Sequence, residues 1–244
     1  MEAWYDAEAK SVTCVDCHHS LTEAAAQSLA SSPPTPPPIE VGVAGAGTAR
    51  RDARIARTWG RLAPVVQFVS DEQQQGANDE RRLAAHLERE LAGEAILLHS
   101  RQIPGTRGDI DHLVIAPSGV WVVDAKNYSG KVERRDVGSW RAVDHRLFVN
   151  GRDRTKLVDG MKRQATVVQK ALLSTAFDKV PIHPTLLFTN SEWPWFARPV
   201  EIRGVQVMWS KKLCELVGQP GPLRRSDIEA VASRLSTQLR VVTS

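Results

Sequence analysis

The fold of this chain is decided by residues 108–130, which read GDIDHLVIAPSGVWVVDAKNYSG. Apolar side chains dominate on both sides of Pro117-Ser118-Gly119, where proline and glycine favour a tight turn. Short apolar or alternating segments bounded by turn residues are typical of β-strands. The stretch therefore predicts strands over residues 109–116 and 120–127, joined as a hairpin.

Charged side chains occupy core positions in both strands. Alternation places Asp111 on the face of Leu113, and it places Asp124 and Lys126 on the face of Val122. A lone Asp-x-Lys is also explained by a strand that leaves its sheet at that point. If the hairpin closes through a two- or four-residue loop, residues whose numbers sum to 235 pair, and Asp111 faces Asp124. A three-residue loop would instead put Asp111 on the other face. Two carboxylates held this close share a cation or a proton.

A third acidic residue lies where an amphipathic helix presents apolar side chains. Residues 77–91 predict such a helix, and Glu80 shares its apolar stripe with Ala84, Leu87 and Leu91. An acid in a first turn also complements the helix dipole without any further role. If the stripe packs on the hairpin, Glu80 approaches the rim where the two aspartates lie.

These residues form a coherent set for phosphodiester chemistry. The carboxylates of Glu80, Asp111 and Asp124 are oxygen ligands suited to Mg²⁺ or Mn²⁺, which polarises a phosphodiester and lowers the pKa of a bound water. Lys126 beside them can position or deprotonate that water and stabilise negative charge on the phosphate.

The remaining pattern predicts an α/β fold. Further strands are expected over residues 95–99, 147–149, 185–189 and 205–209, and further helices over 158–177 and 226–239, the last capped by Ser226. The order α-β-β-β-α-β-β-α describes a mixed sheet flanked by helices.

Residues 108–130 resemble the core of the nuclease-related domain, NERD, a family placed in the PD-(D/E)XK, restriction-endonuclease-like superfamily. The resemblance rests on a Gly-x-x-x-Glu helix start at Gly76–Glu80, an Ile-Asp-His strand, a Gly-Val-Trp-Val turn and strand, and Asp-x-Lys-Asn followed by glycine. Asp124 stands where the family more often has glutamate.

This resemblance implies a restriction-endonuclease-like fold and a divalent-metal-dependent nuclease that hydrolyses phosphodiester bonds in DNA. Asp111, Asp124 and Lys126 correspond to the family motif, and Gln164 resembles a recurrent glutamine. The same folds also host members that do not cleave, so a non-catalytic nucleic-acid-binding or protein-interaction module is the alternative.

Four parts are expected along the chain. They are a disordered tail over residues 1–48 with a Cys14-x-x-Cys17 pair and a proline-rich linker, a basic helix and connector over 49–74, the NERD-like core over 75–190, and strand and helices over 191–244 that complete the domain. A third functional reading is a protein-interaction adaptor that uses the tail. Cys14 and Cys17 supply only half of a zinc site.

The composition is that of a globular protein, with 244 residues, 42% hydrophobic and 25% charged. No apolar run approaches the ~20 residues that span a bilayer, and no signal peptide opens the chain. Three cysteines suit a reducing compartment. We therefore expect a cytoplasmic protein without a membrane segment.

A net charge of +4 permits a polyanionic partner, although a solvated surface explains the same counts. DNA is the expected partner, and the expected phosphate contacts are Arg50, Arg54, Arg57, Arg134, Arg135 and Lys156. Three further residues or segments favour packing roles: His112 as a hydrogen-bonded core histidine, Trp193–Phe196 as a loop packed on the sheet instead of a base-stacking segment, and Cys214 as a core residue.

Overall fold

A computed structural model describes residues 3–6, 11–14, 38–47, 78–193 and 198–242. The chain divides into two compact units, residues 1–37 and 38–244. In the first unit, β1 (Ala3–Asp6) and β2 (Ser11–Cys14) pair as an antiparallel hairpin. All other described elements belong to the second unit.

A six-stranded sheet forms the centre of the second unit, with the strand order β11-β12-β9-β5-β4-β3. Its strands are β3 (Ile96–Gln102), β4 (Asp109–Ala116), β5 (Gly119–Lys126), β9 (Ile182–Phe188), β11 (Val200–Ile202) and β12 (Val205–Met208). The β3–β4, β4–β5 and β11–β12 pairs are antiparallel, whereas β5–β9 and β9–β12 are parallel. The sheet is therefore mixed, and the predicted α/β class is confirmed.

The β4–β5 hairpin has one of the two registers that the sequence left open. His112 pairs with Val123 and Ala116 pairs with Gly119, so the numbers of paired residues sum to 235. Gly119 closes the turn at φ +132, and a Cβ there would lie 2.5 Å from the Pro181 carbonyl oxygen. The turn therefore needs glycine, and the turn geometry fixes which side chains of the hairpin share a face.

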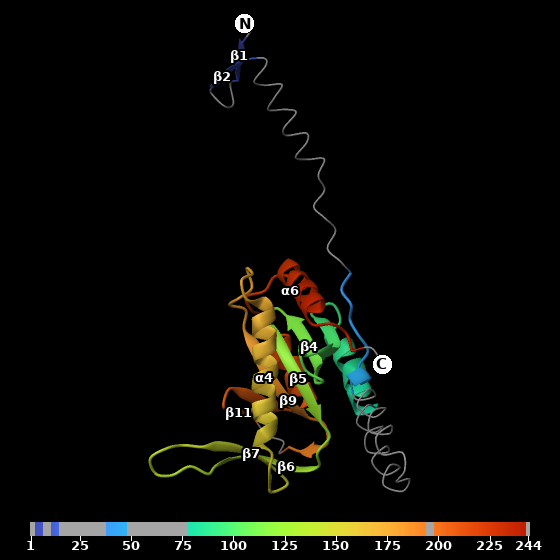
Figure 1. The fold of residues 1–244 in the computed structure, drawn as a ribbon, viewed down its shortest axis with the longest axis vertical. Coiled ribbons are helices and arrows are strands. Elements are labelled where there is room, and N and C mark those ends of the chain that lie inside the picture. Colours follow the sequence, from blue (N-terminus) through green and yellow to red (C-terminus); the bar gives the residue numbers. More distant parts are fainter. Residues whose placement is uncertain (1–2, 7–10, 15–37, 48–77, 194–197, 243–244) are drawn as a thin grey trace. The chain divides into compact units, whose positions relative to one another are not determined.

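Helices cover both faces of this sheet (Figure 1). One face, which carries Leu113 and Val122, packs against α4 (Thr155–Leu172) and α6 (Arg225–Gln238). The other face, which carries Val114 and Val123, packs against the helical residues 78–90 and α5 (Ser210–Val217). The alternation of β4 and β5 thus supplies two separate cores.

A second, four-stranded sheet has the order β10-β6-β7-β8. Its strands are β6 (Gly130–Asp136), β7 (His145–Val149), β8 (Arg152–Asp153) and β10 (Ser191–Glu192). The sequence predicted only residues 147–149 of this sheet. The strand β6 reads GKVERRD and is largely exposed, so it lacks the apolar alternation by which strands are recognised.

Several helix boundaries differ from the predicted ones. The helix expected over residues 158–177 begins at Thr155, whose backbone N–H donates to the Asp153 carboxylate at 2.8 Å, and it ends at Leu172. The prediction that Ser226 caps the last helix was wrong: that helix begins at Arg225, and Asp227 accepts a hydrogen bond from the Arg224 backbone N–H at 2.9 Å. Helices were expected within residues 191–244, but no bounds were predicted for the short helix α5.

Candidate functional site

The acid cluster consists of Asp111 on β4 and Asp124 and Lys126 on β5. Both aspartates are buried, and their carboxyl groups are joined by a hydrogen bond. The Lys126 ammonium donates to Asp124 Oδ1 at 2.5 Å, and its side chain stays partly exposed. The two-residue turn of the hairpin brings these groups together, because it places them on the same face of adjacent strands.

Asp111 is the most perturbed acid of this cluster. Burial raises its pKa well above the ordinary value of 3.8, and the charge of Asp124 and the hydrogen bond to Asp124 raise it further. Lys126 opposes this shift only in part. Asp111 therefore binds a proton more tightly than an exposed aspartate does.

The Lys126 ammonium is kept charged by its neighbours. Burial lowers its pKa, but the charges of Asp124 and Asp111 and the hydrogen bond to Asp124 outweigh that effect, so the pKa is raised. A lysine in this state donates hydrogen bonds and offsets negative charge. It does not accept a proton near neutral pH.

Glu80 acts on the acid cluster from the first turn of the helical residues 78–90. Its negative charge makes a small further contribution to the rise in the Asp111 pKa. Among the described residues, no group of three His, Cys, Asp or Glu side chains has the arrangement of a metal site. Direct ligation by Glu80 therefore stays a prediction.

The acid cluster fits a hard divalent cation by its chemistry. The charge of Asp124 raises the pKa of Asp111, and a cation bound beside the two carboxyl groups offsets that charge. Magnesium is commonly bound through one or two carboxylates, with waters and substrate phosphates filling the other positions. Asp111 and Asp124 provide such a pair.

Gln164 lies on α4, the helix that covers the same face of the sheet. Its Oε1 atom is buried and has no hydrogen-bond partner in the described part of the chain. No hydrogen bond joins Gln164 to the acid cluster within these residues. Its assignment to the site stays a prediction.

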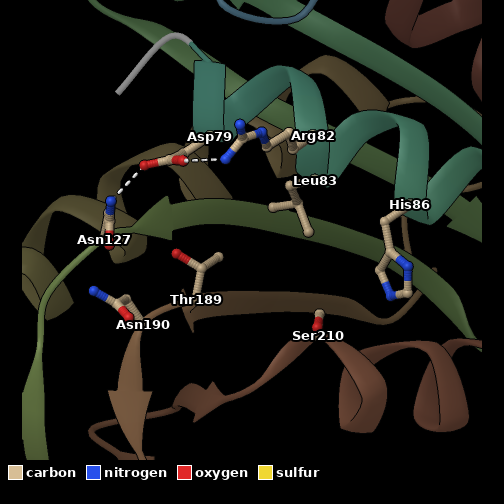
Figure 2. Close-up of a pocket in the computed structure, with 8 residues that line it drawn as sticks. All are labelled: Asp79, Arg82, Leu83, His86, Asn127, Thr189, Asn190 and Ser210. Atoms are coloured by element: carbon tan, nitrogen blue, oxygen red, sulfur yellow. Dashed lines mark hydrogen bonds and ion pairs between the residues drawn. The ribbon is translucent and has the colours of Figure 1, made fainter. Parts of the chain in front are cut away.

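A groove of about 400 Å³ opens at the carboxyl ends of the parallel strands (Figure 2). It is lined by Asp79, Arg82, Leu83, His86, Asn127, Thr189, Asn190 and Ser210. Asp79 contacts both Asn127 and Arg82. Neither Asp111 nor Asp124 lines this groove. Asn127 directly follows Lys126, so the groove begins one residue beyond the acid cluster.

Sequence reasoning missed the groove, although a signal for it existed. Asn127 follows β5, and Thr189 and Asn190 follow β9, the strand parallel to β5. Polar residues that follow parallel strands meet at the same edge of a sheet, where ligands of α/β proteins bind. This arrangement could not be recognised from the sequence, because local pattern does not reveal that β5 pairs with β9.

His112 is a packed core histidine, as predicted. It is fully buried, and its Nδ1 atom lies 2.8 Å from Nδ1 of His99, whose Nε2 lies 3.1 Å from the Glu88 carboxylate. Burial and, to a smaller extent, the charge of His99 lower the His112 pKa to about 3. His112 is therefore neutral at physiological pH.

The predicted phosphate contacts fall into two groups. Arg50, Arg54 and Arg57 lie outside the described residues. Arg134, Arg135 and Lys156 are exposed. Arg135 pairs with Glu133 at 2.5 Å, which partly neutralises it, whereas the Arg134 guanidinium donates to the Glu201 carbonyl at 3.4 Å.

The other segments singled out in the sequence are described only in part. Trp193 packs against Trp209, with ring centroids 5.0 Å apart, while residues 194–197 lie outside the described residues. Cys214 is half-buried on α5. Cys14 belongs to β2, and Cys17 is not described, so the metal-binding hypothesis for this pair stays open.

The α/β fold, with an acid pair and a lysine on adjacent central strands, is consistent with a nuclease-like domain. Residues 75–189 match the model of the NERD family, the nuclease-related domain, so this region of the chain is similar to that family. No curated protein sequence and no solved structure matches the chain. Among the helices of the described residues, none has the length and apolar character needed to cross a membrane.

Proposed function

We propose that this protein is a divalent-metal-dependent nuclease that hydrolyses phosphodiester bonds in DNA. One observation carries the proposal: Asp111 and Asp124 are buried side by side with the Lys126 ammonium against them. Burying two acids together destabilises a fold unless something offsets their repulsion. A cation bound at the site would offset this repulsion and would explain why the two acids lie together.

Asp111 and Asp124 are the residues that would hold Mg²⁺ or Mn²⁺, with Glu80 as a further acid nearby. The ion, when bound, polarises the phosphodiester and lowers the pKa of a bound water. Because the pKa of Asp111 is raised, a proton competes with the cation for this carboxyl group, so metal binding should strengthen as pH rises.

In this proposal, Lys126 supplies a positive charge and a hydrogen-bond donor. Because its pKa is raised, it stays protonated and serves as the hydrogen-bond donor that orients the attacked phosphate and stabilises the negative charge that develops there. Gln164 is a secondary candidate for positioning, since its buried Oε1 atom has an unused acceptor site. Phosphate contacts along the substrate are assigned to Arg50, Arg54, Arg57, Arg134, Arg135 and Lys156.

The ion pair between Lys126 and Asp124 also fits a second function. Lys126 already offsets the charge of Asp124 at 2.5 Å, as a purely structural pair would. A non-catalytic nucleic-acid-binding module with the nuclease fold is therefore the alternative. A ligand that binds the folded state raises its stability, so Mg²⁺ should raise the melting temperature of a nuclease and leave that of such a module unchanged.

The test is an assay of the purified full chain on labelled single- and double-stranded DNA and RNA, with and without Mn²⁺. The proposal expects metal-dependent cleavage of DNA that is abolished by chelation. Lys170→Ala, at an exposed lysine in the last turn of α4, is the matched control for Lys126→Ala and should cleave like the parent. Cleavage that Lys126→Ala leaves intact would exclude this site as its source.

A further inference from the structure

The β6–β7 hairpin presents a large aromatic side chain to solvent. Trp140 is 87% exposed, the highest value for any large apolar residue in the described part of the chain. Val137 and Val143, in the same connecting loop, are exposed as well. A single exposed apolar residue needs no explanation, but a cluster rimmed by polar residues marks an interaction surface.

The loop that carries Trp140 is held by hydrogen bonds. The backbone N–H of Ser139 donates to the Ala142 carbonyl at 2.9 Å, and the N–H of Ala142 donates back at 3.1 Å. Trp140 and Arg141 are therefore the two central residues of a tight turn. Asp136 Oδ1 accepts from the N–H groups of Gly138 and Asp144, both at 2.9 Å, and ties the two strands together below that turn.

The hairpin is fixed to the rest of the second unit both beside its turn and at its base. Beside the turn, Arg203 pairs with Asp144 at 2.5 Å and with Asp159 of α4 at 3.6 Å. Gly130, the first residue of β6, pairs with Ser191 of β10. Because β6 begins four residues after Lys126, the hairpin extends from the edge of the sheet that carries the acid cluster (Figure 1).

The charge around Trp140 suits a nucleic acid. The Arg141 guanidinium lies over the indole ring, 4.3 Å from its centroid, and leaves the other ring face open. Within the described residues, no acidic side chain forms an ion pair with Arg141 or with Arg134. An indole face open to solvent beside Arg141, with Arg134 further along the same hairpin, is suited to stack a base and contact its phosphates.

From these contacts we infer that the Trp140 turn is a stacking platform for an unpaired base, so that the substrate includes single-stranded nucleic acid. A base inside a duplex has both faces covered by its neighbours, and only an unstacked base offers a free face. Trp140 lies ten residues beyond Gly130, and strands extend by about 3.4 Å per residue, so the platform lies at most ~34 Å along the hairpin. The inference rests on the proposed function for its partner and deepens that function.

The test measures binding by the full chain in chelator, so that cleavage does not interfere. Fluorescence anisotropy compares a labelled single-stranded oligonucleotide with a duplex of the same length, for the parent, Trp140→Ala, Trp140→Phe and Leu173→Ala. Leu173 is an exposed apolar residue after α4 and serves as the matched control. The stacked base itself is detected by quenching of 2-aminopurine placed along the single strand.

Trp140→Ala should weaken single-strand binding by about 5- to 100-fold, as for loss of one base–aromatic stack, and should abolish 2-aminopurine quenching. Trp140→Phe should retain most of the affinity, and duplex binding should change by less than about twofold. Arg141→Ala should reduce the slope of log affinity against log salt by about one unit.

Three results would overturn the inference. They are single-strand binding that Trp140→Ala leaves unchanged, an equal loss for single strand and duplex, and Trp140-dependent binding to anionic phospholipid vesicles with none to oligonucleotides. If the parent binds single strands through Trp140 but never cleaves with Mn²⁺, the nuclease proposal fails and the platform stands. If it cleaves without any effect of Trp140, the platform alone fails.

Discussion

Two of the antiparallel hairpins in the described part of the chain, β4–β5 and β6–β7, differ in burial and in the arrangement of their charges. In the first, nearly every side chain is buried, and the charges of Asp111 and Asp124 act on each other through protein. In the second, charged side chains are exposed and pair across the strand surface, as Glu133 does with Lys131 and Arg135.

This difference shows what burial does to the same chemical groups. Coulombic interactions between buried charges are strong, so they shift proton affinities and create a place for a cation. Exposed pairs are screened by water and salt and contribute little to stability, which leaves their charges available to a polyanion. One hairpin is thus suited to chemistry and the other to binding.

The largest effect is expected for Lys126→Ala. Removing the positive charge of Lys126 from the acid cluster should reduce cleavage by ~100-fold or more, as for loss of a hydrogen-bond donor that stabilises the transition state. Metal binding should persist, because both carboxylates remain and a competing positive charge has gone. Single-turnover cleavage together with metal titration checks this, and a simultaneous loss of metal binding would assign Lys126 to the structure of the site instead.

A smaller effect is expected for metal stabilisation. The parent should gain about 2.7 kcal/mol of stability at a free Mg²⁺ concentration 100 times its dissociation constant. Asp111→Asn should lose most of that gain, since it removes one of two charged ligands. Thermal unfolding with and without Mg²⁺ measures both, with Asp178→Asn at an exposed position as the control. Equal Mg²⁺ stabilisation in Asp111→Asn would place the cation elsewhere.

In the absence of metal, Asp111→Asn should be more stable than the parent. The folded-state pKa of Asp111 lies above its unfolded value, so its contribution to stability is complete below that unfolded value and is lost as pH rises through the folded pKa. Asp111→Asn has no carboxyl group at this position, so it does not lose this stability as pH rises. Its melting temperature should exceed that of the parent by about 2–4 °C near pH 8, for ~1 kcal/mol, and should approach it near pH 4. A pH-independent difference would contradict the buried-acid interpretation.

The smallest effect is expected in the exposed hairpin. Glu133→Gln removes the partner of Lys131 and Arg135, yet surface pairs contribute only about 0–1 kcal/mol, so the melting temperature should barely change. Nucleic-acid binding should tighten slightly because two cations are released. A loss of stability comparable to a core substitution would show that this network supports the fold.

Much of the fold and of the acid cluster could be predicted because it depends on local sequence. Apolar alternation and the Pro117-Ser118-Gly119 turn predict the β4–β5 hairpin, whereas its register was left open by the sequence and is fixed by the two-residue turn of the structure. The helices were recognisable by their apolar stripes, although their ends were not, since Arg154 and Arg224, which precede α4 and α6, are not typical capping residues.

The remainder was decided by tertiary structure, for physical reasons. The pairing of β5 with β9 joins residues about sixty positions apart, and no local pattern encodes it. That pairing creates the groove next to Asn127. The charged strand β6 forms because it pairs with β7, not because of its own propensity. Burial and the charge of Asp124 raise the pKa of Asp111, and the charges of Asp124 and Asp111 keep Lys126 charged against the effect of burial. Neither burial nor exposure is specified by a single residue, and the tertiary structure leaves Trp140 87% exposed.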